Sequence, residues 1–255
     1  YHSCSQSRLM KNLVVNGCSF TEANKNQQKW PDFVVKNICP DSYYNIAQGG
    51  AGNKYICDST INFLESNNLV PAETTVLIMW SGIGRKDLHI SGEWFFHLKE
   101  TYTYLCQKNN ESYFLHSGGL ANSWMQDKQL EQVFSPQYKL SDPLSICIEN
   151  LLFFIQLRSY LRERKYNFYF TNYFNTWNKN IESTSGGDYC IANFCVKEDL
   201  PLYNKFDFDD WFFVDTEKNC LGDLAHDMNE LDHTGHPTTT AYEKFAQQVV
   251  IPLLT

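Results

Sequence analysis

The chain has 255 residues and a formal charge of −8, from 21 Lys and Arg against 29 Asp and Glu. Its 43% hydrophobic and 20% charged residues are typical of a folded globular protein and argue against a disordered one. The acidic balance argues against sequence-independent nucleic-acid binding, which needs clustered Lys and Arg. Apolar runs such as Leu151 to Ile155 stop well short of the roughly 18–20 residues of a membrane span.

The cysteines and the start of the sequence bear on the compartment. There are nine cysteines, none of them in a CxxC pair. No charged stretch leads an apolar segment at the start, so no secretory signal is visible. These features predict reduced thiols and a cytoplasmic location. Residues 1–9 are polar and patternless, and we expect an extension there, followed by a single domain over 10–255.

Short apolar runs between turn residues predict the strands. The clearest is Thr74 to Trp80 (TTVLIMW), and Leu13 to Val15 ends at an Asn-Gly pair. Three further runs of this kind predict strands at Tyr43 to Ala47, Tyr166 to Thr171 and Trp211 to Val214.

Helical spacing of apolar residues separates these strands. It predicts helices over Trp30 to Ile38, Tyr55 to Leu64, Pro143 to Lys165 and Thr238 to Leu254. Residues 88–142 lack a clean period and are rich in aromatic residues, Gly and Asn, so we expect an aromatic and polar insertion of loops and short helices. Residues 175–209 are irregular and polar.

The alternation of strands and helices predicts an α/β fold. A parallel sheet covered on both faces by helices, a three-layer α/β/α sandwich, fits this order. In such sheets reactive residues lie in loops after the carboxyl ends of the strands. We therefore expect the chemistry in the segments after Val15, Ala47, Trp80, Thr171 and Val214.

Three of the polar segments contain the parts of a hydrolytic site. Ser19 follows the first strand within Gly17-Cys18-Ser19, a glycine-rich turn with Gly50 follows the second, and Asp232 and His236 precede the last helix. A serine that attacks, a histidine that takes its proton and a carboxylate that orients the histidine form a catalytic triad. Backbone N–H groups beside the serine are suited to bind an oxyanion.

This ordered set resembles the SGNH (GDSL-like) hydrolase superfamily, and the resemblance runs from Gly17 to the end of the chain. Gly17-Cys18-Ser19 is similar to the family's Gly-Asp-Ser block, Gly50 to its second-block glycine, and His236-Pro237 to the histidine of its Asp-x-x-His block. The resemblance implies a flavodoxin-like fold with no cofactor or metal. It also implies that Ser19 is the nucleophile, that His236 is the base, and that the backbone N–H groups of Ser19 and Gly50 bind the oxyanion.

The sequence departs from the family pattern at three positions. Cys18 replaces an aspartate that is not part of the family's triad. Ile83 lies near the place of the oxyanion-hole asparagine, so one side-chain donor is missing. His233 stands three residues before His236, where the family has aspartate, and Asp232 is one place earlier. Either a bulge brings Asp232 to the imidazole or the site is a Ser-His dyad.

Other polar and aromatic residues are further candidates for the site. Trp80, Ser81, Arg85 and Asn53 are candidates to bind substrate, and Arg85 or Asn53 is a candidate replacement for the missing donor. A metal site is disfavoured, because the acidic and histidine residues of the C-terminal loop follow no tight ligand pattern; these are Asp223, His226, Asp227, Asp232, His233 and His236.

The sequence thus predicts a serine esterase that forms an acyl-enzyme on Ser19. Its substrate would be a small acyl ester or, given that aromatic residues make up 15% of the chain, an acetylated glycan. Two alternatives remain. One is a non-catalytic module of the same fold that binds glycan or belongs to an assembly, including a virion. The other is an O-acyltransferase that uses the same serine.

Overall fold

A parallel four-stranded sheet lies at the centre of the protein. In the computed structural model, residues 10–91, 93, 105–108, 112–116, 143–177, 202 and 206–255 are described. The sheet comprises β1 (Asn12–Asn16), β2 (Ser42–Asn45), β3 (Thr74–Trp80) and β7 (Asn167–Asn172), in the order β2-β1-β3-β7. All seven residues of β3 are buried, as expected of a strand covered on both faces.

A fifth strand position follows β7. Trp211 forms a single parallel bridge with Phe170 instead of the strand predicted for Trp211 to Val214. With it, the order becomes the 2-1-3-4-5 arrangement of flavodoxin-like sheets. The predicted fold class is therefore confirmed by the strand order of the chain itself.

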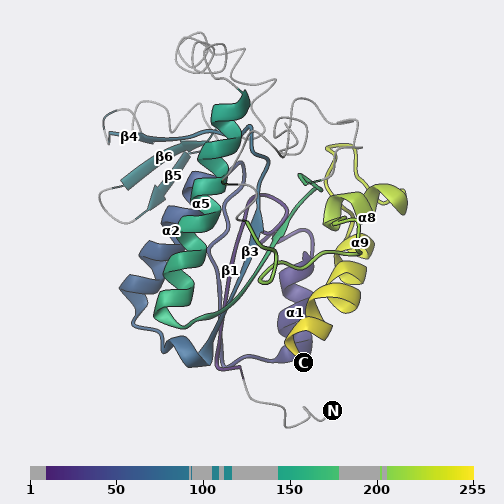
Figure 1. Cartoon of the computed structure of the whole chain (residues 1–255). Coiled ribbons are helices and arrows are strands. Elements are labelled where there is room, and N and C mark those ends of the chain that lie inside the picture. Colours follow the sequence, from purple (N-terminus) through teal and green to yellow (C-terminus); the bar gives the residue numbers. More distant parts are fainter. Residues whose placement is uncertain are drawn as a thin grey trace.

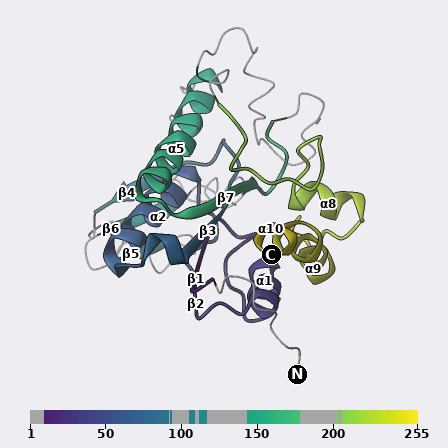
Figure 2. The ribbon, with the colours of Figure 1, turned by 60° about the horizontal axis from the view of Figure 1, so that its bottom comes forward.

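Helices cover both faces of the sheet, which makes three layers (Figures 1 and 2). One face carries α2 (Asn53–Asn67) and α5 (Pro143–Arg164), and the other carries α1 (Trp30–Ile38) and α9 (Thr239–Phe245). Pro31 lies in the first turn of α1, where its missing N–H has no helical acceptor to lose. A short 3-10 helix, η1 (Pro71–Glu73), leads into β3.

The last helix is continuous in direction but changes its winding. After α9 the chain forms a π-helical turn, η3 (Ala246–Val250), and ends in α10 (Ile251–Leu254). Tyr242 and Phe245 of α9 are fully buried. The short helix α8 (Leu221–Asp227) lies beside α9 (Figure 1).

The described part of the predicted insertion is a second sheet, not loops and short helices. β4 (Asp87–Ile90), β6 (Ser112–His116) and β5 (Leu105–Lys108) form an antiparallel sheet in the order β4-β6-β5. The sequence did not predict these strands, because cross-strand pairs of side chains stabilise them and such pairs leave no regular apolar alternation along the chain. The rest of 88–142, the proposed extension 1–9, and residues 178–201 and 203–205 lie outside the described residues.

Helix α5 is the longest helix that the structure describes. From Leu144 to Arg164 it is long and apolar enough to cross a membrane by length and composition alone, which the short apolar runs of the sequence did not indicate. The core helix of a soluble protein passes the same test, and this helix packs Leu151, Phe154 and Leu157 fully or almost fully out of solvent.

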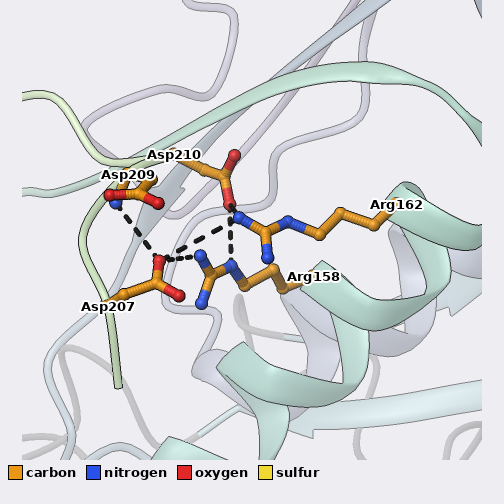
Figure 3. Close-up of polar contacts among 5 residues, drawn as sticks. All are labelled: Arg158, Arg162, Asp207, Asp209 and Asp210. Carbon is orange, nitrogen blue, oxygen red and sulfur yellow. Dashed lines mark hydrogen bonds and ion pairs between the residues drawn. The ribbon is translucent and has the colours of Figure 1, made fainter. Parts of the chain in front are cut away.

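Two arginines tie α5 to the segment before Trp211 (Figure 3). Arg158 Nε donates to Asp210 Oδ2 at 2.7 Å, and Arg158 also pairs with Asp207. Arg162 donates to the same Asp210 oxygen at 2.7 Å. Because Arg158 is buried, these carboxylates compensate a charge that would otherwise be costly in the interior.

Candidate active site

Ser19 lies in a tight turn that follows β1 directly. The backbone N–H groups of Thr21 and Glu22 both donate to the Cys18 carbonyl, at 2.9 Å each. No helix starts at this serine; α1 begins only at Trp30. A Cβ atom on Gly17 would lie 2.5 Å from Thr21 Oγ1 and 2.9 Å from the Met79 carbonyl oxygen, so only glycine fits between the turn and β3. The turn is therefore fixed against the central strands.

A buried asparagine holds the start of this turn. Asn16 accepts a hydrogen bond from the Gly17 backbone N–H at 2.8 Å. Its side-chain nitrogen donates to Ser59 and Thr60 of α2, at 2.7 Å and 2.9 Å. The end of β1 is thus bonded to the helix on one face of the sheet, which sets the direction in which Ser19 leaves the strand.

The structure brings Ser19 and His236 together across 217 residues of sequence. Ser19 Oγ lies 2.8 Å from His236 Nε2, within hydrogen-bond reach. The Phe20 ring packs on the imidazole with a centroid distance of 4.9 Å. This is the geometry that a serine nucleophile and its general base require.

Asp232 does not contact the imidazole directly. His236 Nδ1 lies 2.9 Å from Thr234 Oγ1, and Thr234 Oγ1 lies 2.5 Å from Asp232 Oδ1. The arrangement is therefore neither the direct contact that a one-residue bulge would have given nor an isolated Ser-His dyad. The turn places the hydroxyl of Thr234 between the carboxylate and the ring.

The charges around His236 favour the neutral imidazole. Burial lowers the pKa of His236, and the positive charges of Lys29 and Arg85 lower it further against the opposing effect of Asp232. Partial burial raises the pKa of Asp232, but hydrogen bonds from Thr234 and from the His236 backbone outweigh it, so the pKa lies below its usual value. Near neutral pH the site thus holds a neutral base and an ionised carboxylate.

Sequence reasoning missed Lys29, which lies beneath the nucleophile. Its Nζ donates to the backbone carbonyl of Ser19, and the residue is only 5% exposed. Burial lowers the pKa of this lysine, although nearby Glu22 and Asp32 oppose the shift. The lysine fixes the peptide that follows Ser19 and contributes positive charge near His236.

The glycine-rich turn after β2 is held by a carboxylate from the second sheet. Asp87 accepts hydrogen bonds from the backbone N–H groups of Gly52 and Tyr55, at 2.8 Å each, and so caps the start of α2. Gly50 has a φ of 77°, which favours glycine. Within the described part of the chain, the N–H groups of Gly50 and Ser19 donate to no protein acceptor.

Asn53 and Ile83 do not supply the missing side-chain donor. Ile83 is 1% exposed and apolar. Asn53 is also buried, and its amide bonds the Ser81 backbone at both ends and Asn150, at 2.7–3.0 Å. Asn53 is therefore a structural link between α2, β3 and α5, not a ligand-binding residue. Only its hydrogen-bond network, which sequence does not show, distinguishes the two roles.

Trp80 and Ser81 also belong to the core. Trp80 is fully buried, with ring centroids 4.6 Å from Phe154 and 5.4 Å from Phe170. Ser81 is likewise fully buried. Both were candidates because they follow β3, but the strand end turns them inward, so neither is open to a substrate.

Arg85 lies close to the site. Its guanidinium carbon is 5.3 Å from the centroid of the Tyr173 ring, and that ring packs on Phe20 at 4.6 Å. Its charge is near enough to lower the pKa of His236. Arg85 therefore remains a candidate to contact substrate.

Among the described residues, no group of three or more His, Cys, Asp or Glu side chains is placed to hold a metal ion. The cysteines whose side chains the structure describes are free thiols: Cys18, Cys39, Cys57, Cys147 and Cys220.

Comparison with solved structures finds chains of similar architecture. A lipase, Lip_vut3 from a goat rumen metagenome, is 12% identical with a TM-score of 0.47, over 93% of this chain and 95% of that one. A protein described as an acylhydrolase from Bacteroides fragilis is 14% identical, with a TM-score of 0.45 over 93% and 84%. YXIM of Bacillus subtilis is 10% identical, with a TM-score of 0.47 over 96% and 56%.

No known protein-family model matches the sequence, and no curated protein sequence matches it either. With TM-scores below 0.5, the three structural similarities do not bear on what this chain binds or catalyses. The class that its own fold and side chains define is a flavodoxin-like α/β/α protein with a Ser-His pair at the carboxyl edge of the sheet.

Proposed function

We propose that this protein is a serine ester hydrolase. The observation that carries the proposal is the 2.8 Å contact between Ser19 Oγ and His236 Nε2 at the carboxyl edge of the parallel sheet. The lowered pKa of His236 supports it, because a neutral imidazole is ready to accept a proton.

The chemistry proceeds in two steps. Ser19 Oγ attacks the ester carbonyl while its proton moves to His236 Nε2, and the imidazolium then gives that proton to the departing alcohol oxygen. Water, deprotonated by His236, next attacks the acyl-enzyme, and Ser19 recovers its proton. In both steps the N–H groups of Ser19 and Gly50 are the proposed donors to the oxyanion.

The rate is expected to be modest. Ile83 lies near the place where the family that the sequence resembles has a side-chain donor, and the Asn53 amide is engaged elsewhere. Losing one oxyanion donor costs about 10²–10³ in rate in serine hydrolases. Small activated esters are therefore the first substrates to test, and acetylated carbohydrates are the second.

The non-catalytic module and the acyltransferase stand as alternatives. The Ser19–His236 contact favours catalysis over a module that only binds. An acyltransferase would use the same acyl-enzyme and differ only in passing the acyl group to a hydroxyl acceptor, so an assay with added sugar acceptors separates it from a hydrolase.

Labelling with a fluorophosphonate probe tests the proposal. The wild type is expected to form one adduct, located on Ser19 by mass spectrometry. Ser19→Ala and His236→Ala should lose labelling and should lower hydrolysis of a p-nitrophenyl ester by about 10³-fold or more. Ser66→Ala, on an exposed position of α2, is the matched control. A folded wild type that is not labelled, or is labelled at another serine, would overturn the proposal.

A further inference from the structure

The hydroxyl of Thr234 separates Asp232 from the imidazole of His236. We propose that Thr234 is a positioning residue that fixes the tautomer of His236, a role that direct contact with the carboxylate would otherwise fill. The kinetic part of this proposal rests on the proposed function, whereas the tautomer itself does not.

The hydrogen bonds around Asp232 show which groups are donors and which is the acceptor. Asp232 Oδ1 lies 2.7 Å from the Thr234 backbone nitrogen, 2.5 Å from Thr234 Oγ1 and 3.1 Å from the His236 backbone nitrogen. An ionised carboxylate only accepts hydrogen bonds. All three neighbours therefore donate to the same oxygen.

Thr234 has a single hydroxyl hydrogen, which it donates in the hydrogen bond to Asp232. Toward His236 Nδ1, 2.9 Å away, the Thr234 oxygen can only offer a lone pair. The contact is a hydrogen bond only if Nδ1 carries the proton. In the neutral ring Nε2 is then unprotonated, and it faces Ser19 Oγ at 2.8 Å.

The four groups form one chain of hydrogen bonds with a single direction. Ser19 O–H donates to Nε2, Nδ1–H donates to Thr234, and Thr234 O–H donates to Asp232. Bonds arranged head to tail polarise one another, so the negative charge of Asp232 strengthens the basicity of Nε2 through the hydroxyl. The turn thus gives the base its correct tautomer before a substrate arrives.

Different residues control the charge of His236 and its tautomer. The charged groups that affect His236 are Asp232, which raises its pKa, and Lys29 and Arg85, which lower it. The Thr234 hydroxyl is neutral, so its main contribution is the position of a proton. A valine, which has a similar shape but no hydroxyl, removes that contribution and leaves the charges in place.

Nitrogen NMR of the His236 ring tests the tautomer without any substrate. In the wild type and in Thr234→Ser, Nδ1 is expected to carry the proton and Nε2 to be unprotonated, with His236→Ala identifying the signals. In Thr234→Val, Nδ1–H loses its acceptor, and a mixture of tautomers is expected. Thr234 is exposed, so both variants are expected to fold.

Labelling rates test the consequence for the nucleophile. Thr234→Val should react with the fluorophosphonate about 10- to 100-fold more slowly, the rate equivalent of one hydrogen bond that involves a charged group. Thr234→Ser should stay within about 3-fold of the wild type, because it keeps the hydroxyl.

The outcomes distinguish this proposal from the proposed function. A wild-type His236 protonated on Nε2, or a Thr234→Val protein with unchanged tautomer and unchanged labelling, would overturn the role of Thr234. If the wild type holds the expected tautomer but neither the wild type nor any variant reacts with the probe, the proposed function fails while the assignment of Thr234 stands.

Discussion

The two halves of the site are held in opposite ways. The nucleophile turn, residues 17–21, is bonded to distant parts of the chain: Asn16 reaches α2, and Gly17 fits against Met79 of β3. The histidine turn, residues 231–237, is bonded mainly to itself. Asp232 and Thr234 organise it, and a bridge between Leu231 and Pro237 closes it.

This difference shows where each half gets its precision. The position of Ser19 depends on the packing of the surrounding core, so changes in core packing shift it directly. The histidine is placed by hydrogen bonds within five residues, in a segment whose middle residues, 233–235, are exposed. Gln27, which follows the nucleophile turn, also reaches the histidine turn: its Nε2 donates to the Pro237 carbonyl at 2.9 Å.

Substituting one glycine in each turn gives the largest expected contrast. Gly17→Ala places a methyl group 2.9 Å from a backbone oxygen of β3, which cannot move without disturbing the sheet, and should destabilise the protein by about 3 kcal/mol. Gly235→Ala meets nothing within 4 Å and carries only the cost of its φ of 80°, about 1 kcal/mol.

Denaturant unfolding of both glycine variants measures this contrast, and probe labelling shows what happens to Ser19. Gly17→Ala should also slow labelling, because the turn must shift. Equal losses of stability in the two variants would contradict the view that only the nucleophile turn depends on the core.

Removing the buried Lys29, which contacts the nucleophile turn, should change the pKa of the base His236. Lys29→Met eliminates a positive charge that lowers the pKa of His236, so that pKa should rise. The acid limb of the labelling rate then moves to higher pH. Lys36→Met, on an exposed position of α1, is the matched control and should leave the limb in place. If the labelling rate of Lys29→Met falls at the same acid pH as that of the wild type, Lys29 acts only through its bond to Ser19.

The pH dependence of the wild type gives the smallest expected effect. Because burial and the two cations lower the pKa of His236, the imidazole stays neutral, and the base stays competent, below the ordinary histidine value of about 6.5. The labelling rate should therefore hold as the pH falls through 6.5, and decline only below it. A midpoint at or above that value would mean that Asp232, acting through Thr234, outweighs the other charges.

The sequence predicted most of the fold, because apolar spacing reports which side of an element is buried. The predicted segments Thr74 to Trp80 and Trp30 to Ile38 match β3 and α1 at both ends. The second sheet was missed, since β4, β5 and β6 are stabilised by pairing with one another and carry little periodic signal. The strand at Trp211 shrank to one bridge.

The candidate site was predicted less evenly. Ser19 and His236 could be found from their places at strand and helix ends. Thr234 could not, because its role depends on how one turn folds, although Asp-x-Thr is a spacing that favours a side-chain bond to the backbone two residues on. The core roles of Asn53 and Trp80 depend on which way a side chain leaves the end of an element, and spacing along the chain does not give that direction.

The hydrogen bonds of the histidine turn begin and end within a few residues, from the Thr238 N–H that donates to the Glu230 carbonyl to the Asp232 N–H that donates to the His236 carbonyl. A segment with this property is modular. Because these bonds do not involve Ser19, we expect the turn to keep its internal order when Ser19 is substituted. The turn that carries the base is ordered by its own short peptide, whereas the turn that carries the nucleophile is ordered by the surrounding fold. The charge of the base still depends on burial and on Lys29 and Arg85.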